Sequence, residues 1–384
     1  SSRPQGARRR RAQDDHASQP ARAEAELDAA AGDDAECALA TTLRGGEKSA
    51  HRQRECDGRV DSSSVIVSPP TSPACPGAAA ITLGTLYISQ RALIFPRPAR
   101  PEAVTTYGGP EARLLVIDAP EDAPRDVGGS IACAWFPPAT KDAPVLVYFH
   151  GNADQIGWGG AFLGRQLRER SAPAKVGFLA VEYPGYGYAH GAGAPTERSI
   201  YATAKTAVEY ARTELAAGHR VALVGQSLGC APALEVAATL AADDDAAAHT
   251  DVVLLSPFLS IADMAAELLP VVPKPLLRPL VRDAFDNVRN ADKLRPTQAG
   301  TLVVHGTRDE VVPFRHGRDL ADRLAGGGSS SSSSRTSGPR RRFVPLAGAG
   351  HNDLLSPPYG DAVAREILDF VAVEDDARMT RQRQ

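Results

Sequence analysis

The sequence predicts a doubly wound α/β domain, with a mostly parallel eight-stranded sheet and helices packed on both of its faces. Short apolar runs rich in β-branched residues recur after about residue 79, and several are continuous instead of alternating. Strands that are buried on both faces of a parallel sheet have this pattern. Helical stretches separate the runs, and strands that alternate with helices at this spacing form βαβ units.

Each element follows from its own run of residues. The predicted strands are Leu114–Ile117, Ile131–Phe136, Val145–Phe149, Val176–Val181, Val221–Val224, Val252–Leu255, Leu302–Val304 and Phe343–Pro345. The predicted helices are Ala161–Arg170, Thr196–Ala217, Leu228–Ala242, Arg315–Leu324 and Pro358–Val373.

Two segments break this alternation. Residues 257–294 are too long for a connecting loop and carry apolar helical pieces punctuated by prolines, so we expect a short helical cap beyond a strand end. Residues 326–342 begin with three glycines and six serines and end in a basic run, which predicts a low-complexity loop insertion with little capacity to bury surface.

The ends of the chain differ in composition from its middle. Residues 1–77 contain few apolar residues, a basic run, acidic and Ala-rich stretches and a Ser/Pro-rich stretch, so we expect a disordered N-terminal tail. The folded domain is predicted to span residues 78–375, and residues 376–384 form a second, short tail.

Composition excludes several classes of function. A net charge of -3 gives no reason to expect a nucleic-acid partner. The five cysteines are odd in number, scattered and without CxxC spacing, so we expect a reducing compartment and neither a disulfide framework nor a zinc site. Cys133 and Cys230 lie in apolar surroundings and are expected to be buried. The other three, Cys37, Cys56 and Cys75, lie in the polar N-terminal stretch.

No apolar run reaches the roughly 20 residues that span a bilayer. The nearest candidate, Ala78–Pro96, is interrupted by Gln90 and Arg91. We therefore expect a cytoplasmic or peripheral-membrane location. The chain begins at Ser1 without a methionine, as an N-terminally shortened fragment would.

The strongest catalytic signal is the pentapeptide Gly225-Gln226-Ser227-Leu228-Gly229. It lies between a predicted strand and a predicted helix. In that setting the serine occupies a sharp, strained turn, its hydroxyl is exposed above the sheet, and glycines stand where side chains would clash. The helix that follows directs its positive N-terminus at a developing oxyanion. Ser227 is therefore the predicted nucleophile.

A serine hydroxyl needs a general base, and His351 has the best setting for one. It lies in the loop Gly348-Ala349-Gly350-His351-Asn352-Asp353 after the last predicted strand. His150 and His305 also follow strands, but each precedes a glycine in a turn and is interpreted as structural. The remaining histidines lack such a setting: His16, His51, His190, His219, His249 and His316.

The third residue of the predicted triad must hold the imidazole in the correct tautomer. Asp309 follows the strand Leu302–Val304, and its neighbour Glu310 is expected to face another way. The resulting order along the chain, Ser227, Asp309 and His351, is the order found in α/β-hydrolases.

An oxyanion hole requires two backbone N–H groups. One is expected from Leu228, directly after the nucleophile, and the other from Asn152 in the loop after the strand Val145–Phe149, with Ala153 as the alternative. A serine mechanism needs neither a metal nor an organic cofactor, so none is expected.

The chain resembles a known family through several motifs in order: HGNADQIG, EYPGYG, GQSLG, SPFLSIADMAAELLP, VRDAFDN, HGTRDEVVP and GAGHND. They are similar to the Bem-type branch of the α/β-hydrolase-domain-containing proteins, which is related to serine aminopeptidase-like hydrolases and to membrane-associated protein depalmitoylases. The resemblance runs from about Tyr87 to Val373. It implies an α/β-hydrolase fold, a triad of Ser227, Asp309 and His351, and an oxyanion hole at Asn152 and Leu228. It does not extend to residues 1–77 or to the insertion at 326–342.

The predicted function is hydrolysis of a carboxylic ester or acyl thioester, on a small-molecule or lipidated substrate, through an acyl-enzyme. The cap is expected to lie over Ser227 and to supply Met264 and Leu268 to the acyl pocket. Aminopeptidase-like cleavage is one alternative, in which Asp263 and Glu267 would bind the substrate amine. A catalytically inactive scaffold is the other.

Overall fold

The computed structural model describes residues 87–98, 100–173, 175–216, 220–242, 250–294, 300–326 and 340–382, all within the unit Ser72–Gln384. The tail expected over residues 1–77 lies outside the described residues. So does residue range 327–339, which forms most of the expected insertion.

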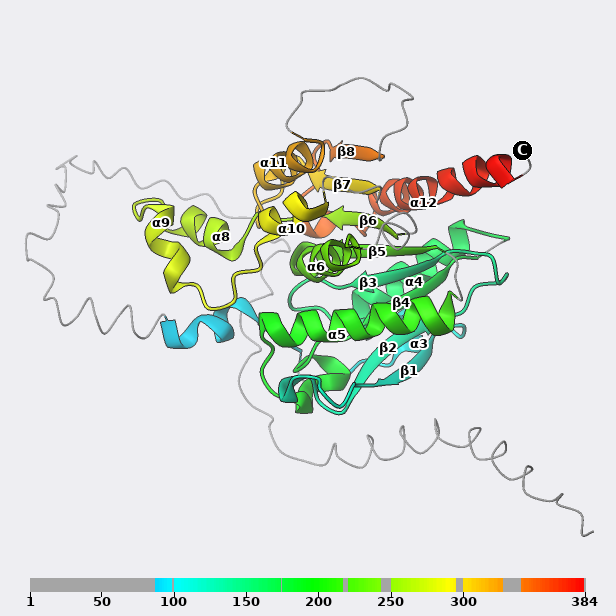
Figure 1. The fold of residues 1–384 in the computed structure, drawn as a ribbon, viewed down its shortest axis with the longest axis horizontal. Coiled ribbons are helices and arrows are strands. Elements are labelled where there is room, and N and C mark those ends of the chain that lie inside the picture. The colour runs from blue at the N-terminus through cyan, green and yellow to red at the C-terminus, as the bar shows by residue number, and fades with distance from the viewer. Residues whose placement is uncertain are drawn as a thin grey trace, which may run out of the picture. The chain divides into compact units, whose positions relative to one another are not determined.

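An eight-stranded, mostly parallel sheet forms the centre of the fold (Figure 1), as predicted. Its strands are β1 (Arg113–Asp118), β2 (Ser130–Phe136), β3 (Val145–Phe149), β4 (Gly177–Val181), β5 (Val221–Gln226), β6 (Thr250–Leu255), β7 (Thr301–Gly306) and β8 (Arg341–Leu346). Their order across the sheet is β1-β2-β4-β3-β5-β6-β7-β8. Strand β2 is antiparallel to both of its neighbours, and the strands from β4 to β8 are parallel.

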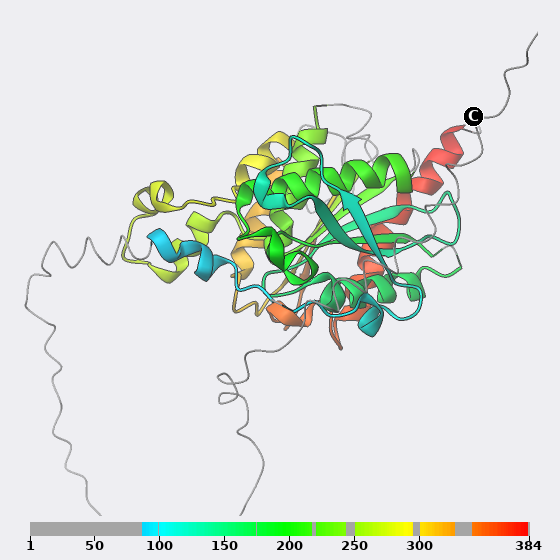
Figure 2. The same ribbon diagram turned by 90° about the horizontal axis from the view of Figure 1, so that it is seen from below.

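Helices cover both faces of the sheet. They are α3 (Val104–Gly108), α4 (Ala161–Arg170), α5 (Glu197–Tyr210), α6 (Cys230–Leu240), α8 (Ile261–Leu268), α9 (Lys274–Leu277), α10 (Asn287–Leu294), α11 (Phe314–Leu324) and α12 (Gly360–Gln382). Figures 1 and 2 show α5, α6, α10 and α11 on one face and α4 and α12 on the other.

The core lies in two layers, one on each side of the sheet. Along β3, Val145, Val147 and Phe149 pack into the layer under α5 and α6, whereas Leu146 and Tyr148 pack into the layer under α4 and α12. All five side chains are fully buried, which explains why the run is continuously apolar. The carboxyl ends of the parallel strands lie on the same side of the domain, and the loops that follow them carry the predicted site residues.

Two of the predicted segments have different bounds in the structure. Helix α10 lies inside the segment expected to form the cap, yet it packs against α6 and α11, and its Ala291 and Leu294 are buried in the core. The cap proper therefore ends before residue 287. Helix α12 continues to Gln382, past the expected start of the C-terminal tail at residue 376, because the sequence after Gly360 contains no further glycine or proline to end it.

Cys133 and Cys230 are free and buried, as predicted. Cys37, Cys56 and Cys75 lie outside the described residues. A short helix over residues 87–94, within the apolar stretch noted in the sequence, was not predicted. Among the described helices, none is long and apolar enough to cross a membrane.

Candidate active site

Ser227 lies at the turn between β5 and α6 with a φ angle of +50°, a left-handed conformation that few side-chain-bearing residues adopt. The flanking glycines make this turn possible. A Cβ atom on Gly225 would lie 2.3 Å from the carbonyl oxygen of Gly229, and one on Gly229 would lie 2.0 Å from that of Phe149. Backbone therefore passes too close on both sides for any residue other than glycine.

Asp309 lies in the loop after β7, and its side chain is fully buried. Oδ1 accepts hydrogen bonds from the backbone N–H groups of Val311 and Val312, at 3.0 and 2.7 Å. These two bonds fix the carboxylate, so Oδ2 points toward the loop that carries His351.

The structure brings Ser227, Asp309 and His351 together from three separate strand ends. His351 Nδ1 lies 2.8 Å from Asp309 Oδ2, and its Nε2 lies 3.1 Å from Ser227 Oγ. A carboxylate at Nδ1 favours the tautomer with the proton on that nitrogen, which leaves Nε2 free to accept the proton of the serine. This geometry suits a serine whose hydroxyl is deprotonated during attack.

Two imidazoles contact Asp309, although only His351 was predicted to do so. His305 Nε2 lies 3.3 Å from Asp309 Oδ2 and 2.9 Å from the carbonyl oxygen of Val312. Burial acts to raise the pKa of Asp309, but the hydrogen bonds from His305 and His351 outweigh it and hold the pKa well below its usual range. The carboxylate therefore stays ionised. Glu310, the competing acid, instead accepts the backbone N–H of His351 at 3.3 Å.

The loop that follows β3 lies against the nucleophile, since a Cβ atom on Gly151 would be 3.8 Å from Ser227 Cβ. The backbone N–H of Ala153 donates to Asn152 Oδ1 at 3.1 Å. Among the described residues, the backbone N–H of Asn152 has no such partner, so it remains available to an oxyanion. The geometry favours Asn152 over Ala153 as the donor that would act together with Leu228.

A buried polar cluster holds this loop. Tyr186 donates to Asn152 Oδ1 at 2.6 Å, and Tyr183 donates to the carbonyl oxygen of His150 at 2.8 Å. His150 Nε2 lies 3.0 Å from Glu182 Oε1, with both side chains fully buried. Burial acts to lower the pKa of His150, but the bond to Glu182 outweighs it, so the pKa is raised. The EYPGYG motif thus supports the loop that carries Asn152.

The cap residues predicted to contact substrate have different environments. Met264 packs partly buried against the core, whereas Leu268 is 81% exposed. The two carboxylates considered for amine binding already have cationic partners, since Asp263 contacts Lys274 and Glu267 contacts Arg315. His316 Nε2 also lies 3.2 Å from Glu267 Oε1. No carboxylate of this pair is left to bind a substrate amine.

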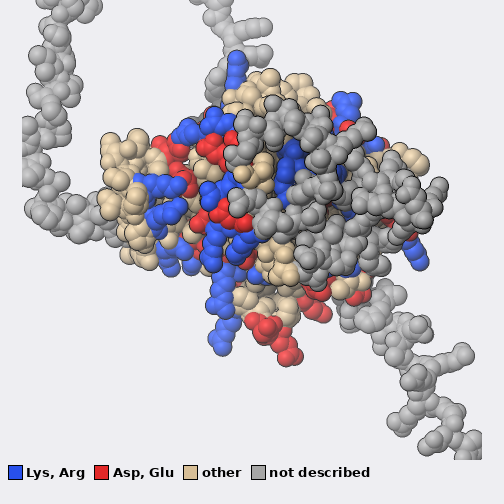
Figure 3. Space-filling model, turned by 45° about the horizontal axis from the view of Figure 1, so that its top comes forward, with Lys and Arg blue, Asp and Glu red and all other residues tan. Residues whose placement is uncertain are grey.

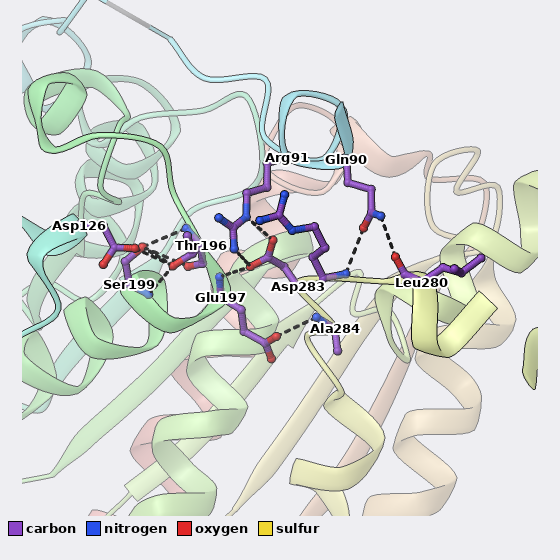
Figure 4. Close-up of polar contacts among 10 residues, drawn as sticks. Gln90, Arg91, Asp126, Thr196, Glu197, Ser199, Leu280, Asp283 and Ala284 are labelled. Atoms are coloured by element: carbon purple, nitrogen blue, oxygen red, sulfur yellow. Dashed lines mark hydrogen bonds and ion pairs between the residues drawn. The ribbon is translucent and has the colours of Figure 1, made fainter. Parts of the chain in front are cut away.

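The helix over residues 87–94 joins the cap to the rest of the site (Figure 4). Arg91 binds Asp283 through two nitrogens at 2.7 and 3.2 Å, and Asp283 also accepts the backbone N–H of Glu197 at 2.9 Å. At the end of the helix, the carbonyl oxygen of Ile94 accepts a hydrogen bond from Asn152 Nδ2. The helix over residues 87–94 therefore contacts both the cap and the candidate oxyanion loop.

The chain is similar in sequence to known proteins. The human alpha/beta hydrolase domain-containing protein 17B is 30% identical over 253 residues, which cover 64% of this chain and 73% of that protein. The chain belongs to the α/β-hydrolase-domain-containing protein family. An uncharacterized protein of Mycobacterium tuberculosis is also similar, with 30% identity over 275 residues, or 70% of this chain and 82% of that protein.

Among solved structures, carboxyl esterase 2 of Tuber melanosporum superposes with a TM-score of 0.50 at 17% identity, covering 76% of this chain and 97% of the esterase. This likeness supports the α/β-hydrolase fold of this family member. No protein-family model matches the chain.

Sequence reasoning missed the residues that support the site. Tyr183 and Tyr186 belong to the EYPGYG motif, and nothing local in the sequence links them to Asn152. Gln90 and Arg91 did carry a signal, because they are polar residues within an apolar run. Both side chains bind the cap in this α/β-hydrolase-domain-containing protein.

Proposed function

We propose that this protein is a serine hydrolase that cleaves a carboxylic ester or acyl thioester through a covalent acyl-enzyme. The observation that carries the proposal is the continuous chain of contacts from Asp309 Oδ2 to His351 Nδ1 (2.8 Å) and from His351 Nε2 to Ser227 Oγ (3.1 Å). The positive φ angle of Ser227 supports it, because strained backbone of this kind concentrates at functional sites.

In the first half-reaction, His351 Nε2 takes the proton of Ser227 as Oγ attacks the carbonyl carbon of the substrate. The resulting oxyanion accepts hydrogen bonds from the backbone N–H groups of Asn152 and Leu228. The imidazolium, stabilised by Asp309, then gives its proton to the departing alcohol or thiol.

In the second half-reaction, His351 removes a proton from water, which attacks the acyl-enzyme. The collapse of the second tetrahedral intermediate releases the acid and returns the proton to Ser227. Each N–H group of the oxyanion hole contributes about 2.7–4 kcal/mol of transition-state stabilisation in comparable enzymes.

Esters and thioesters are preferred over peptides as substrates because of the charges in the cap. An aminopeptidase must bind a substrate ammonium group with an unpaired acidic side chain. Asp263 and Glu267 both contact cations of the protein itself. We therefore expect turnover of ester and thioester substrates to exceed that of the matching aminoacyl amide.

Fluorophosphonate labelling followed by mass spectrometry tests the proposal directly. We expect the probe on Ser227 alone, and we expect Ser227→Ala to abolish both labelling and ester turnover while the thermal midpoint is unchanged. Ser356→Ala, which removes an exposed serine, is the matched control and should label normally. A probe found on another serine would exclude this mechanism, and a folded wild-type protein without labelling would favour the scaffold alternative.

A further inference from the structure

A histidine and a glutamate face each other in the core, directly beside the candidate oxyanion loop. His150 follows β3 and Glu182 follows β4, and these strands are parallel neighbours in the sheet. Both side chains are fully buried. A Cβ atom on Gly187 would lie 2.4 Å from Glu182 Oε2, so this glycine makes room for the carboxylate. Burying two such groups costs free energy that their attraction does not always return, which points to a use beyond packing.

Both ring nitrogens of His150 face acceptors. Nδ1 lies 2.8 Å from the carbonyl oxygen of Gly151, which can only accept a hydrogen bond, so Nδ1 must carry a proton. Nε2 lies 3.0 Å from Glu182 Oε1, and an ionised carboxylate likewise only accepts. An imidazole that donates from both nitrogens is an imidazolium, and the negative charge of the pair then lies on Glu182.

The surroundings of the ring favour its positive charge. The ring centres of Tyr183 and Tyr186 lie 4.1 and 5.5 Å from that of His150, within the range of a cation–π contact. Burial acts to lower the pKa of His150, but Glu182 and then Asp154 act to raise it, and the net direction is upward.

The hydrogen bond from Nδ1 also sets the direction of the candidate oxyanion donor. The carbonyl oxygen of Gly151 and the N–H of Asn152 belong to one trans peptide unit, in which these two groups point in opposite directions. Because the carbonyl oxygen is held against the buried ring of His150, the N–H points away from that ring. Gly151 lies beside Ser227, so the N–H is free to face a substrate bound at the nucleophile.

The same hydrogen bond strengthens the donor. Hydrogen bonds in a chain polarise one another, and a charged donor has a larger effect than a neutral one. On the face shown in Figure 3, Lys and Arg side chains lie among Asp and Glu side chains, where water and salt screen their fields. The buried pair is screened much less, and His150, its positive member, is the one that contacts the loop.

We propose that His150 is an imidazolium that aims and polarises the peptide between Gly151 and Asn152, and that Glu182 keeps the second proton on the ring. The peptide N–H then stabilises the oxyanion more strongly than an ordinary backbone donor. His150 is a positioning residue, because it acts through the backbone and does not touch the substrate. Its role in the reaction rests on the proposed esterase function, whereas its charge does not.

Glu182→Gln tests the role of the charge, because it keeps the size of the side chain and a hydrogen bond to Nε2 while it removes the carboxylate. We expect kcat to fall about tenfold while KM stays within about twofold. The affinity for a trifluoromethyl ketone, whose adduct with Ser227 carries an oxyanion, should fall by the same factor as kcat. Glu111→Gln is the matched control and should leave all three values unchanged. Glu111 pairs with Arg168 and Lys175, and Lys175 precedes β4 at the opposite end of the strands.

Nuclear magnetic resonance of the protein labelled with ¹⁵N-histidine tests the charge itself, with His150→Gln to assign the signals. Both ring nitrogens of His150 should be protonated at about pH 8, above the ordinary pKa of about 6.5, and Glu182→Gln should lose one of these protons. The proposal is overturned if one ring nitrogen is unprotonated in the wild type. It is also overturned if Glu182→Gln lowers the thermal midpoint but leaves the ketone affinity unchanged. A wild-type chain that the fluorophosphonate does not label would instead exclude the esterase function, and the resonance signals would still decide the charge of His150.

Discussion

The turn at Ser227 and the cap are both beside the reacting groups, but they are held in opposite ways. The turn is enclosed by backbone, so a single added carbon at Gly229 would lie 2.0 Å from a carbonyl oxygen. The cap exposes much of its apolar surface, and polar contacts around Gln90, Arg91 and Asp283 join it to the helix over residues 87–94. The turn, which must hold Ser227 accurately, is therefore built into the core, whereas the cap lies largely outside the core.

The largest expected effect is a loss of turnover when the contacts between Asp309, His351 and Ser227 are removed. Asp309→Asn should keep the fold but misplace the imidazole proton, with a loss of about 10⁴ in turnover by analogy with other serine triads. His351→Ala should lose at least as much, with partial recovery at high pH, where hydroxide replaces the base. Steady-state kinetics of each single variant and of the double variant provide the measurement. Losses that multiply in the double variant would show that the residues do not act as a unit.

The next effect is on stability and concerns the tightly enclosed turn. Gly229→Ala should lower the free energy of unfolding by about 3 kcal/mol, because the new methyl group has no room beside the backbone of Phe149. Gly191→Ala is the control, since a Cβ atom there would meet nothing within 4 Å, and we expect a change within about 0.5 kcal/mol. Chemical denaturation measures both. Equal stability of the two variants would contradict the described packing.

A smaller effect is expected at the support of the oxyanion loop. Tyr186→Phe removes the hydroxyl that donates to Asn152 Oδ1 at 2.6 Å and should lower kcat about tenfold, with little change in KM. Tyr107→Phe, at an exposed tyrosine, should leave both constants unchanged. An effect of Tyr186→Phe on thermal stability alone, without one on kcat, would assign this residue a purely structural role.

Within the cap, we expect changes in preference and not in chemistry. Met264→Ala and Met264→Phe should shift the preferred acyl-chain length in opposite directions by a few-fold, while fluorophosphonate labelling of Ser227 stays at the wild-type level. A panel of nitrophenyl esters from two to sixteen carbons measures this preference. An unchanged profile in both variants would remove Met264 from the acyl pocket.

The smallest expected effect is a dependence of the free energy of unfolding on pH. Because the pKa of His150 is raised by Glu182, the folded protein binds more protons than the unfolded chain between the ordinary pKa of about 6.5 and the raised one. This contribution to stability is complete below about pH 6.5 and is lost as the pH rises through the folded value. Denaturation at several pH values should show the slope, and Glu182→Gln should diminish it. An identical slope in that variant would exclude the pair as its source.

The sequence was sufficient for the sheet and for the meeting of the three candidate catalytic residues. Short apolar runs, several of them continuous, marked all eight strands. Parallel strands bring the residues that follow them to the same end of the sheet, whatever their distance along the chain. It was insufficient where a contact depends on packing between distant segments. No local pattern in the sequence indicates the hydrogen bonds of Tyr186 to Asn152 or of Arg91 to Asp283. The position of α10 likewise depends on its packing against α6 and α11, which are distant in sequence.

The connection between β7 and β8 has a practical consequence. Helix α11 starts near the carboxyl end of β7, where the candidate catalytic residues lie, and leads the chain back to the other end of the strands. There the carbonyl oxygen of Arg340 accepts a hydrogen bond from the backbone N–H of Thr301, the first residue of β7, and β8 begins beside it. A break in the chain after residue 326 would leave Ser227 and Asp309 on one fragment and His351 on the other. Under the proposed mechanism, labelling of Ser227 would then report whether the two fragments have reassociated through β8, as in a split reporter.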